Sequence, residues 1–301
     1  MGPMVLALGN FDGVHLGHQR LIRNMVSCAR GLKVPAAAFT FNPHPIQVLA
    51  PEKAPRLLIT PERRSEMIAN LGVDVLLMVP FTRELARLSP EYFVQEIIHR
   101  QLRAPAVFVG FNYTFGHRGA GTPQLLQQMG ERLGFKVEVL PPIKVGNITV
   151  SSSEVRAALE AGDVSRARSY LGYWPIIEGR VVLGDQRGRQ LGFPTANLEL
   201  SSEVLIPGHG VYAAKVKVND RLFDGVVNIG VRPTFGELAL SVEVHILEFA
   251  QVIYGEWITL FLLGKIRNET KFSSVSELVS QIRRDIEAAR KIKPGPLFTQ
   301  A

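Results

Sequence analysis

The architecture of the first half of the chain follows from residues 4–18, MVLALGNFDGVHLGH. The first five residues form a short apolar run typical of a buried strand, and Gly9 follows them directly. Apolar side chains then recur at spacings of three and four from Leu21 to Ala29, which indicates a helix with one buried stripe. A strand that passes through a glycine turn into a helix is typical of an α/β unit, and ligands of such units bind at the carboxyl ends of the strands.

The same alternation continues to residue 140. Short apolar or β-branched runs predict further strands over residues 34–41, 73–79, 106–109 and 136–140. Three helices between them begin at a hydroxyl residue followed by proline, at Thr60-Pro61, Ser89-Pro90 and Thr122-Pro123. There the hydroxyl caps the helix and the missing N–H of proline costs nothing. This order predicts a parallel sheet with right-handed crossovers and helices on both faces.

The pattern changes after residues 171–175, LGYWP. Short strands then follow closely over residues 177–183, 211–218, 223–229, 240–247 and 257–266, separated by turn residues. The last predicted helix carries one apolar stripe from Val275 to Ala289. We therefore predict two domains, an α/β domain over residues 1–173 and a small antiparallel β-barrel with a closing C-terminal helix over residues 174–301.

Composition excludes several classes of protein. The chain has 301 residues, of which 46% are hydrophobic, so it can bury a large core and is not intrinsically disordered. No apolar run is long enough to span a membrane, and no signal peptide is evident at the N-terminus. The single cysteine, Cys28, suits a reducing compartment, and its apolar neighbours predict that it lies in the core. We therefore expect a cytoplasmic protein that does not associate with membranes.

The formal net charge of +7 is unevenly distributed. Residues 1–173 contain 19 Lys and Arg against 13 Asp and Glu, a net charge of +6, whereas residues 174–301 contain 15 against 14, a net charge of +1. The basic residues of the first part are dispersed, so solvated helix faces and an electropositive cleft explain them equally well. Basic charge of this size suits nucleic acids and small anions alike.

Two histidines follow the first strand, in the segment His15-Leu16-Gly17-His18. Residues three apart lie on one face of a helix, and we expect Gly17 to leave room for a ligand. The free N–H groups and the dipole of a helix start favour phosphate. A lone histidine pair is more often structural, but its glycine frame and its place at a strand end favour a phosphate site. Two imidazoles there would stabilise the charge that develops on an α-phosphorus as pyrophosphate leaves.

A second candidate phosphate site begins at Ser151, where three serines are followed by Arg156. A helix N-cap explains one serine, since serine is common at that position. Three serines with an arginine one turn later favour a helix start that binds a polyphosphate, with Arg156 neutralising the departing phosphates.

The second domain carries a glycine- and arginine-rich stretch over residues 179–198. By itself this stretch is as consistent with a long hairpin loop as with a loop that folds over phosphates. It ends in Pro-Thr-Ala-Asn, where Thr195 and Asn197 offer two neutral oxygen ligands of the kind that Mg²⁺ accepts beside water and nucleotide phosphates. In the strand over residues 240–247, alternation places Val242 and Val244 toward the core and Glu243 on the opposite face. By pattern alone, Glu243 is more often simply a solvent-facing residue.

Residues 9–19, 41–45 and 109–116 resemble the FMN adenylyltransferase module of bacterial bifunctional FAD synthetases, a branch of the nucleotidylyltransferase superfamily. The resemblance implies a Rossmann-like domain that transfers AMP from ATP to FMN and releases pyrophosphate. It implies catalytic roles for His15, His18 and Arg156, and ATP contacts at Phe11, Gly13, His15, His18, Ser152 and Arg156. It implies FMN contacts at Asn42, Pro43, His44, Pro45 and Asn112. Many family members carry Asp at the position of Asn112. The Asn side chain can form hydrogen bonds there but supplies no negative charge.

Residues 179–198, 228–235, 242–246 and 266–272 resemble riboflavin kinases. The resemblance implies that this domain phosphorylates riboflavin to FMN with ATP and Mg²⁺, and that Glu243 is the base for the ribityl 5′-hydroxyl. It implies ATP contacts at Gly184, Arg189 and Gly192, metal ligands at Thr195 and Asn197, and flavin contacts at Arg267 and Phe272.

The sequence thus predicts an enzyme that makes FMN and FAD from riboflavin and ATP and binds no nucleic acid. One alternative is a monofunctional riboflavin kinase with an impaired adenylyltransferase module. An RNA-binding module or a tRNA-dependent ligase is disfavoured, because basic patches are not interleaved with aromatic residues. A flavin carrier is disfavoured, because it has no need of Glu243 or of metal ligands. The oligomeric state stays open.

Overall fold

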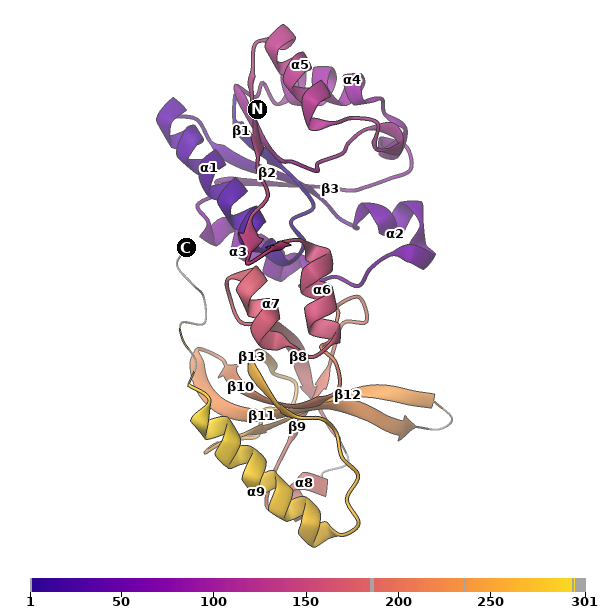
Figure 1. Cartoon of the computed structure of the whole chain (residues 1–301), viewed down its shortest axis with the longest axis vertical. Helices are drawn as coiled ribbons and strands as arrows, with labels where there is room; N and C mark the ends of the chain where they lie inside the picture. The colour runs from indigo at the N-terminus through magenta and orange to yellow at the C-terminus, as the bar shows by residue number, and fades with distance from the viewer. Residues whose placement is uncertain (1, 185–186, 235–236, 294, 296–301) are drawn as a thin grey trace. The chain divides into compact units, whose positions relative to one another are not determined.

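The computed structural model describes residues 2–184, 187–234, 237–293 and 295; the side chains of residues 187, 189, 232–234 and 237–239 lie outside this description. Contacts divide the chain into two compact units, Met1–Ser152 and Ser153–Ala301, shown in Figure 1. This division assigns α6 (Ser152–Glu160) and α7 (Val164–Leu171) almost wholly to the second unit. The boundary between residues 173 and 174 therefore stays a prediction.

The first unit is built on a parallel sheet with the strand order β3-β2-β1-β4-β5. Its register places Leu6 of the first strand beside Ala37 and Val107. Apolar or β-branched runs in the sequence predict all five strands, although the second and third begin two residues later than predicted. The strands are β1 (Val5–Leu8), β2 (Ala36–Phe41), β3 (Val75–Val79), β4 (Ala106–Gly110) and β5 (Lys136–Leu140).

The predicted helices of this unit are present, and the three predicted caps are confirmed. A short helix over Pro45–Leu49 is not predicted by the sequence pattern. The hydroxyl oxygens of Thr60, Ser89 and Thr122 each accept a hydrogen bond from a backbone N–H in the first turn of the helix. The helices are α1 (Leu16–Leu32), α2 (Pro45–Leu49), α3 (Pro61–Asn70), α4 (Pro90–Tyr92) with its π-helical continuation Phe93–Gln101, and α5 (Pro123–Leu133). Short 3₁₀ turns lie at Asp12–Val14, Pro51–Lys53, Leu85–Arg87 and His117–Gly119, and β6 (Lys144–Val145) pairs with β7 (Ile148–Thr149).

The core of the first unit lies between the sheet and these helices, and it includes Leu6, Phe39, Phe93 and Leu126. Cys28 is half-buried rather than part of this core, because it lies at the edge of the buried stripe of α1. The prediction of a core position for Cys28 is therefore wrong.

The second unit contains the predicted antiparallel barrel, which is closed in the order β10-β11-β12-β9-β8-β13. The long C-terminal helix α9 (Val275–Lys291) packs against β10, β11 and β13, and Figure 1 shows it in yellow beside the barrel. The strands are β8 (Ile176–Val182), β9 (Ala196–Glu199), β10 (Gly210–Val218), β11 (Arg221–Thr234), β12 (Glu237–Ile246) and β13 (Trp257–Arg267), and α8 (Arg187–Gln190) lies between β8 and β9.

The sequence pattern does not predict β9, because its four residues carry Asn197 and Glu199 in place of an apolar run. In the part of the chain that the structure describes, no helix has both the length and the apolar character required to cross a membrane.

Candidate active sites

The loops that hold the predicted adenylyltransferase residues share one edge of the parallel sheet. The chain runs from β1 outward through β2 to β3 and then returns to β4 on the other side of β1. Ligands of such sheets bind at the carboxyl ends of the strands, at the point where the strand order reverses. Residue 9 follows β1, Asn42 follows β2, and the loop of Asn112 follows β4. The fold therefore brings the histidine loop and both predicted FMN loops to the same edge.

His15 and His18 lie together at the start of α1. His15 is the N-cap residue, and its Nδ1 accepts a hydrogen bond from the N–H of His18 at 3.4 Å. The two rings stack with their centroids 3.6 Å apart, and Phe11 packs edge-on against His18. A Cβ atom on Gly17 would lie 3.2 Å from the ring of His15. Gly17 thus lets the ring of His15 approach the start of α1 closely, and its predicted contact with a ligand stays a prediction.

The environment of His18 keeps its ring uncharged at neutral pH. Burial lowers the pKa of His18 well below its usual value, and the nearby charges of His15 and Arg64 lower it further. The buried Nδ1 of His18 has no hydrogen-bond partner among the described residues. A neutral imidazole contributes to a phosphate site as a hydrogen-bonding group rather than as a full positive charge.

The turn before α1 is tightly packed. Gly13 has a φ of +75°, and a Cβ atom there would lie 2.6 Å from the side chain of Leu58. The Asp12 carboxylate accepts a hydrogen bond from the N–H of Leu58, and the hydroxyl of Ser152 donates to the carbonyl of Asp12 at 3.0 Å. The structure thus joins Ser152 to the histidine loop. Phe11 is fully buried, and its predicted contact with ATP stays a prediction.

The two predicted FMN loops differ in their contacts with the histidine loop. His44 caps α2, and its Nε2 lies 3.3 Å from the side-chain nitrogen of Asn10, so the segment from Asn42 to Pro45 is tied to the histidine loop. Asn112 is exposed in the loop after β4. Sequence reasoning does not single out Asn10, although its place between the first strand and the histidines is a signal that could have identified it.

In the barrel, strand register places Asn197 directly opposite Glu243. Asn197 of β9 pairs with Glu243 of β12 on one side and with Val182 of β8 on the other. Residues opposite one another in neighbouring antiparallel strands present their side chains on the same face. Asn197 is buried and Glu243 is half-buried, while Val242 and Val244 are fully covered, as the alternation predicts.

The glycine-rich segment packs against the predicted metal ligands. A Cβ atom on Gly184 would lie 2.1 Å from the side-chain nitrogen of Asn197, and one on Gly188 would lie 3.3 Å from the hydroxyl of Thr195. His245 follows Glu243 by two residues on β12. Its Nδ1 lies 2.8 Å from the carbonyl oxygen of Pro194. Glycines on one side and β12 on the other therefore hold the segment that carries Thr195 and Asn197.

Gly192 and Arg189 are also predicted to contact ATP in the kinase site. Gly192 is exposed with a φ of +85° and has open space where a side chain would be. Arg189 lies in α8, but its side chain is outside the described part of the structure. Their predicted contacts with ATP stay predictions.

The oxygen donors of this site suit Mg²⁺. Thr195 supplies a hydroxyl and Asn197 an amide carbonyl, and the carboxylate of Glu243 lies on the neighbouring strand. Mg²⁺ prefers oxygen ligands and keeps several waters beside substrate phosphates, so two protein ligands are sufficient. Within the described ranges, no cluster of three or more His, Cys, Asp or Glu residues offers a competing metal site.

Gly184→Ala is expected to reduce the activity of the barrel site on the order of 100-fold, since a displacement of about 1 Å in a positioning group has this effect. The added methyl group would occupy the place of the Asn197 amide and displace it. The rate of ATP-dependent phosphate transfer checks this, with the activity of the first unit as an internal control. Unchanged barrel activity would show that Asn197 does not depend on this contact.

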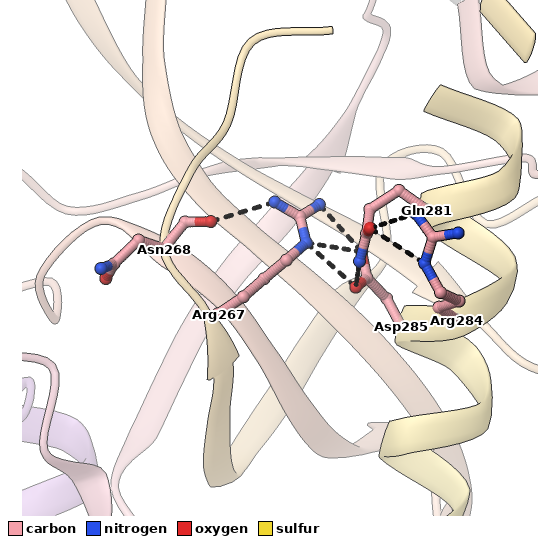
Figure 2. A network of polar contacts seen from close by, with 5 residues as sticks. All are labelled: Arg267, Asn268, Gln281, Arg284 and Asp285. Atoms are coloured by element: carbon pink, nitrogen blue, oxygen red, sulfur yellow. Dashed lines mark hydrogen bonds and ion pairs between the residues drawn. The ribbon is translucent and has the colours of Figure 1, made fainter. Parts of the chain in front are cut away.

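Arg267 forms a network with the C-terminal helix, shown in Figure 2. Its Nε and Nη2 donate to the carboxylate of Asp285 at 2.8 to 3.0 Å, and its Nη1 donates to the carbonyl of Asn268. Asp285 is only 2% exposed and also accepts a hydrogen bond from Gln281. The guanidinium carbon lies 5.6 Å from the ring centroid of Phe272. Arg267 therefore fixes α9 to the end of β13, and its predicted contact with a flavin stays a prediction.

Comparison with known proteins matches the two parts of the chain to two different families. Residues 1–154 match the FAD synthetase family model, and residues 171–293 match the riboflavin kinase model. The bifunctional riboflavin kinase/FMN adenylyltransferase of Bacillus subtilis is 40% identical over 95% of this chain and 91% of its own length. The chain belongs to the bifunctional riboflavin kinase/FMN adenylyltransferase family. The Escherichia coli K12 member of the family is 39% identical, over 95% of this chain and 92% of its own length.

A solved structure has the same fold over nearly the whole chain. It comes from Streptococcus pneumoniae and is described as a macrolide-efflux protein; the TM-score is 0.89 at 32% identity, covering 97% of this chain and 95% of that one. Between the two matched family segments lie residues 155–170, which include Arg156. Arg156 belongs to the second unit, whereas His15, His18 and Ser152 belong to the first. Its role in the adenylyltransferase site therefore stays a prediction.

Proposed function

We propose that this member of the riboflavin kinase/FMN adenylyltransferase family makes FAD from riboflavin in two ATP-dependent steps at two separate sites. The barrel phosphorylates riboflavin to FMN, and the α/β domain transfers AMP from ATP to FMN with release of pyrophosphate. The observation that supports this most strongly is that each family model matches a different unit. Each unit also contains its own predicted site, the stacked histidines in one and the Asn197–Glu243 pair in the other.

In the adenylyltransferase, we propose that the start of α1 binds the phosphates of ATP. An oxygen of the FMN phosphate attacks the α-phosphorus, and the bond to the β-phosphate breaks, so that pyrophosphate leaves with the bonding electron pair. The imidazoles of His15 and His18 stabilise the charge that develops, together with Arg156. The loops that contain His44 and Asn112 hold FMN in line for this attack.

In the kinase, we propose that Glu243 accepts the proton of the ribityl 5′-hydroxyl as its oxygen attacks the γ-phosphorus and ADP leaves. Thr195 and Asn197 would hold Mg²⁺, which when bound would neutralise negative charge on the phosphates. Phosphoryl transfer depends mainly on positioning and charge neutralisation, so a half-buried carboxylate with a modest role as a base is sufficient. The glycine-rich segment with Gly184, Arg189 and Gly192 covers the ATP phosphates, and Phe272 contacts the flavin.

The uneven charge suits this division of labour. The first part of the chain has a net charge of +6 and would bind two polyanions, ATP and FMN, whereas the second part has +1 and would bind ATP and uncharged riboflavin. We propose small molecules rather than nucleic acids as partners. One half-buried, unpaired cysteine fits a reducing compartment, and we propose a cytoplasmic location.

The test is to incubate the purified protein with riboflavin, ATP and Mg²⁺ and to resolve the flavins by chromatography over time. FMN is expected first and FAD later, each at the expense of ATP. FMN without FAD would support the alternative of a monofunctional kinase. The absence of both products would contradict the proposed function.

A further inference from the structure

A buried arginine lies beside the histidine site, and the sequence does not distinguish it from its neighbour. Arg64, at the start of α3, is 4% exposed, whereas the side chain of Arg63 is 22% exposed and pairs with Glu66 at the surface. The helix turns by about 100° per residue, so the side chain of Arg64 points into the protein while that of Arg63 lies at the surface. Burial lowers the pKa of Arg64, and the carboxylates of Asp12 and Glu62 oppose that shift.

The guanidinium of Arg64 joins the carboxyl ends of two neighbouring strands. Its Nη1 donates to the carbonyl of Asn10 at 2.9 Å, just beyond β1. Its Nη2 donates to the carbonyl of Phe41 at 3.0 Å, at the last residue of β2. A planar guanidinium has its donors at fixed angles, so these two bonds define the separation of the two carbonyl groups.

The two carbonyl groups belong to the loops on which the proposed site depends. Asn10 opens the loop that contains His15 and His18, and its carbonyl also accepts a hydrogen bond from the hydroxyl of Thr40. Its side-chain amide contacts the ring of His44. Phe41 opens the segment from Asn42 to Pro45. The ATP-side and FMN-side loops of the proposed site are therefore held together by one buried side chain.

Arg64 is too well covered to be a substrate ligand itself. Both terminal nitrogens are bonded to backbone carbonyls, and its Nε is buried with no hydrogen-bond partner among the described residues. Burying a charged group is costly unless polar groups compensate for the lost water, and here two loop carbonyls do so. The charge also reaches His18, whose pKa it helps to lower.

We propose that Arg64 is a positioning residue for adenylyl transfer, which holds the histidine loop and the Asn42–Pro45 loop at the separation that aligns ATP with FMN. This inference rests on the proposed function of the α/β domain. It assigns to Arg64 an effect on the rate of the chemical step and not on the affinity for either substrate.

The test compares Arg64→Met, Arg64→Lys and Arg30→Met with the wild type in FAD formation from FMN and ATP. Arg30 is a matched control in the same unit, since it also binds a backbone carbonyl and bridges two segments, but beside Ala36 at the amino end of β2. The thermal unfolding of each variant reports whether the first unit is folded, and kinase activity of the same polypeptide reports whether the barrel is intact. Wild-type protein that forms no FAD would contradict the proposed function itself, separately from the role of Arg64.

Arg64→Met is expected to lower kcat for FAD formation on the order of 100-fold, the cost of a misplacement of about 1 Å, with the KM values for ATP and FMN within about threefold of the wild type. Arg64→Lys keeps the charge but not the fork of donors, and its kcat is expected to fall about tenfold. Arg30→Met is expected to stay within about twofold. A rise in KM with unchanged kcat, or an equal loss in Arg30→Met, would overturn the proposal. If Arg64→Met does not fold, Arg64→Lys alone decides, and a kcat within about twofold of the wild type would overturn it.

Discussion

Glu243→Gln should reduce FMN formation from riboflavin by about 10²- to 10⁴-fold, while FAD formation from supplied FMN stays within about twofold of the wild type. The range is that of a general base in a well-positioned site. Glutamine keeps the size and hydrogen-bonding capacity of the side chain but cannot accept the hydroxyl proton. Because Asn197 lies directly opposite on β9, the amide can still pack there, so the loss is chemical rather than structural.

Initial rates of FMN and FAD formation, measured separately by chromatography, check this prediction. Glu199→Gln is the matched control, since Glu199 is an exposed carboxylate on β9, two residues from Asn197. It should leave both rates unchanged. A Glu243→Gln variant with a normal rate of FMN formation would mean that the carboxylate is only a solvent-facing residue.

His18→Ala should reduce FAD formation by about 10²- to 10³-fold, the usual cost of removing one donor that stabilises transition-state charge, and leave FMN formation intact. The imidazole lies at the start of α1, stacked on His15, and the second unit contains no part of this pair. His18→Asn, which retains an N–H donor of similar reach, should recover part of the lost rate.

The matched control for His18 is His99→Ala. His99 is also half-buried and stacks on an aromatic ring, that of Phe135, but it lies on the π-helix that leads to the amino end of β4. In a protein that remains folded, His99→Ala should change neither the rate of FMN formation nor the rate of FAD formation. If His18→Ala removed both activities from a protein that remains folded, the model of two separate sites would be wrong.

The local elements of the fold follow from the sequence because their signals are local. Thr60, Ser89 and Thr122 cap helices through contacts within one turn, and β1 to β4 are apolar or β-branched runs. In β5, β-branched valines alternate with Lys136 and Glu138. The four residues of β9 have no such signal, because β9 is defined by its neighbours β8 and β12 rather than by its own composition.

The sites follow from the sequence only in part. Motif resemblance identifies Asn197 and Glu243 individually, but their direct pairing depends on the register of a closed barrel. Gly17 lies between the two histidines in the sequence, yet the close approach of the His15 ring to it depends on the rotamer of His15. Arg267 has the charge of a ligand, but it binds Asp285 from a helix 18 residues further along the chain. The physical reason is the same in each case: side-chain partners are set by tertiary packing.

The most direct test of two separate sites is to mix the Glu243→Gln and His18→Ala variants with riboflavin, ATP and Mg²⁺ and to follow FAD by chromatography. Neither variant alone should make FAD in quantity, because one forms little FMN and the other does not adenylylate it efficiently. The mixture should make FAD after a lag in which FMN accumulates, since each variant keeps the site that the other has lost. A mixture that forms no more FAD than the two variants separately would contradict the account.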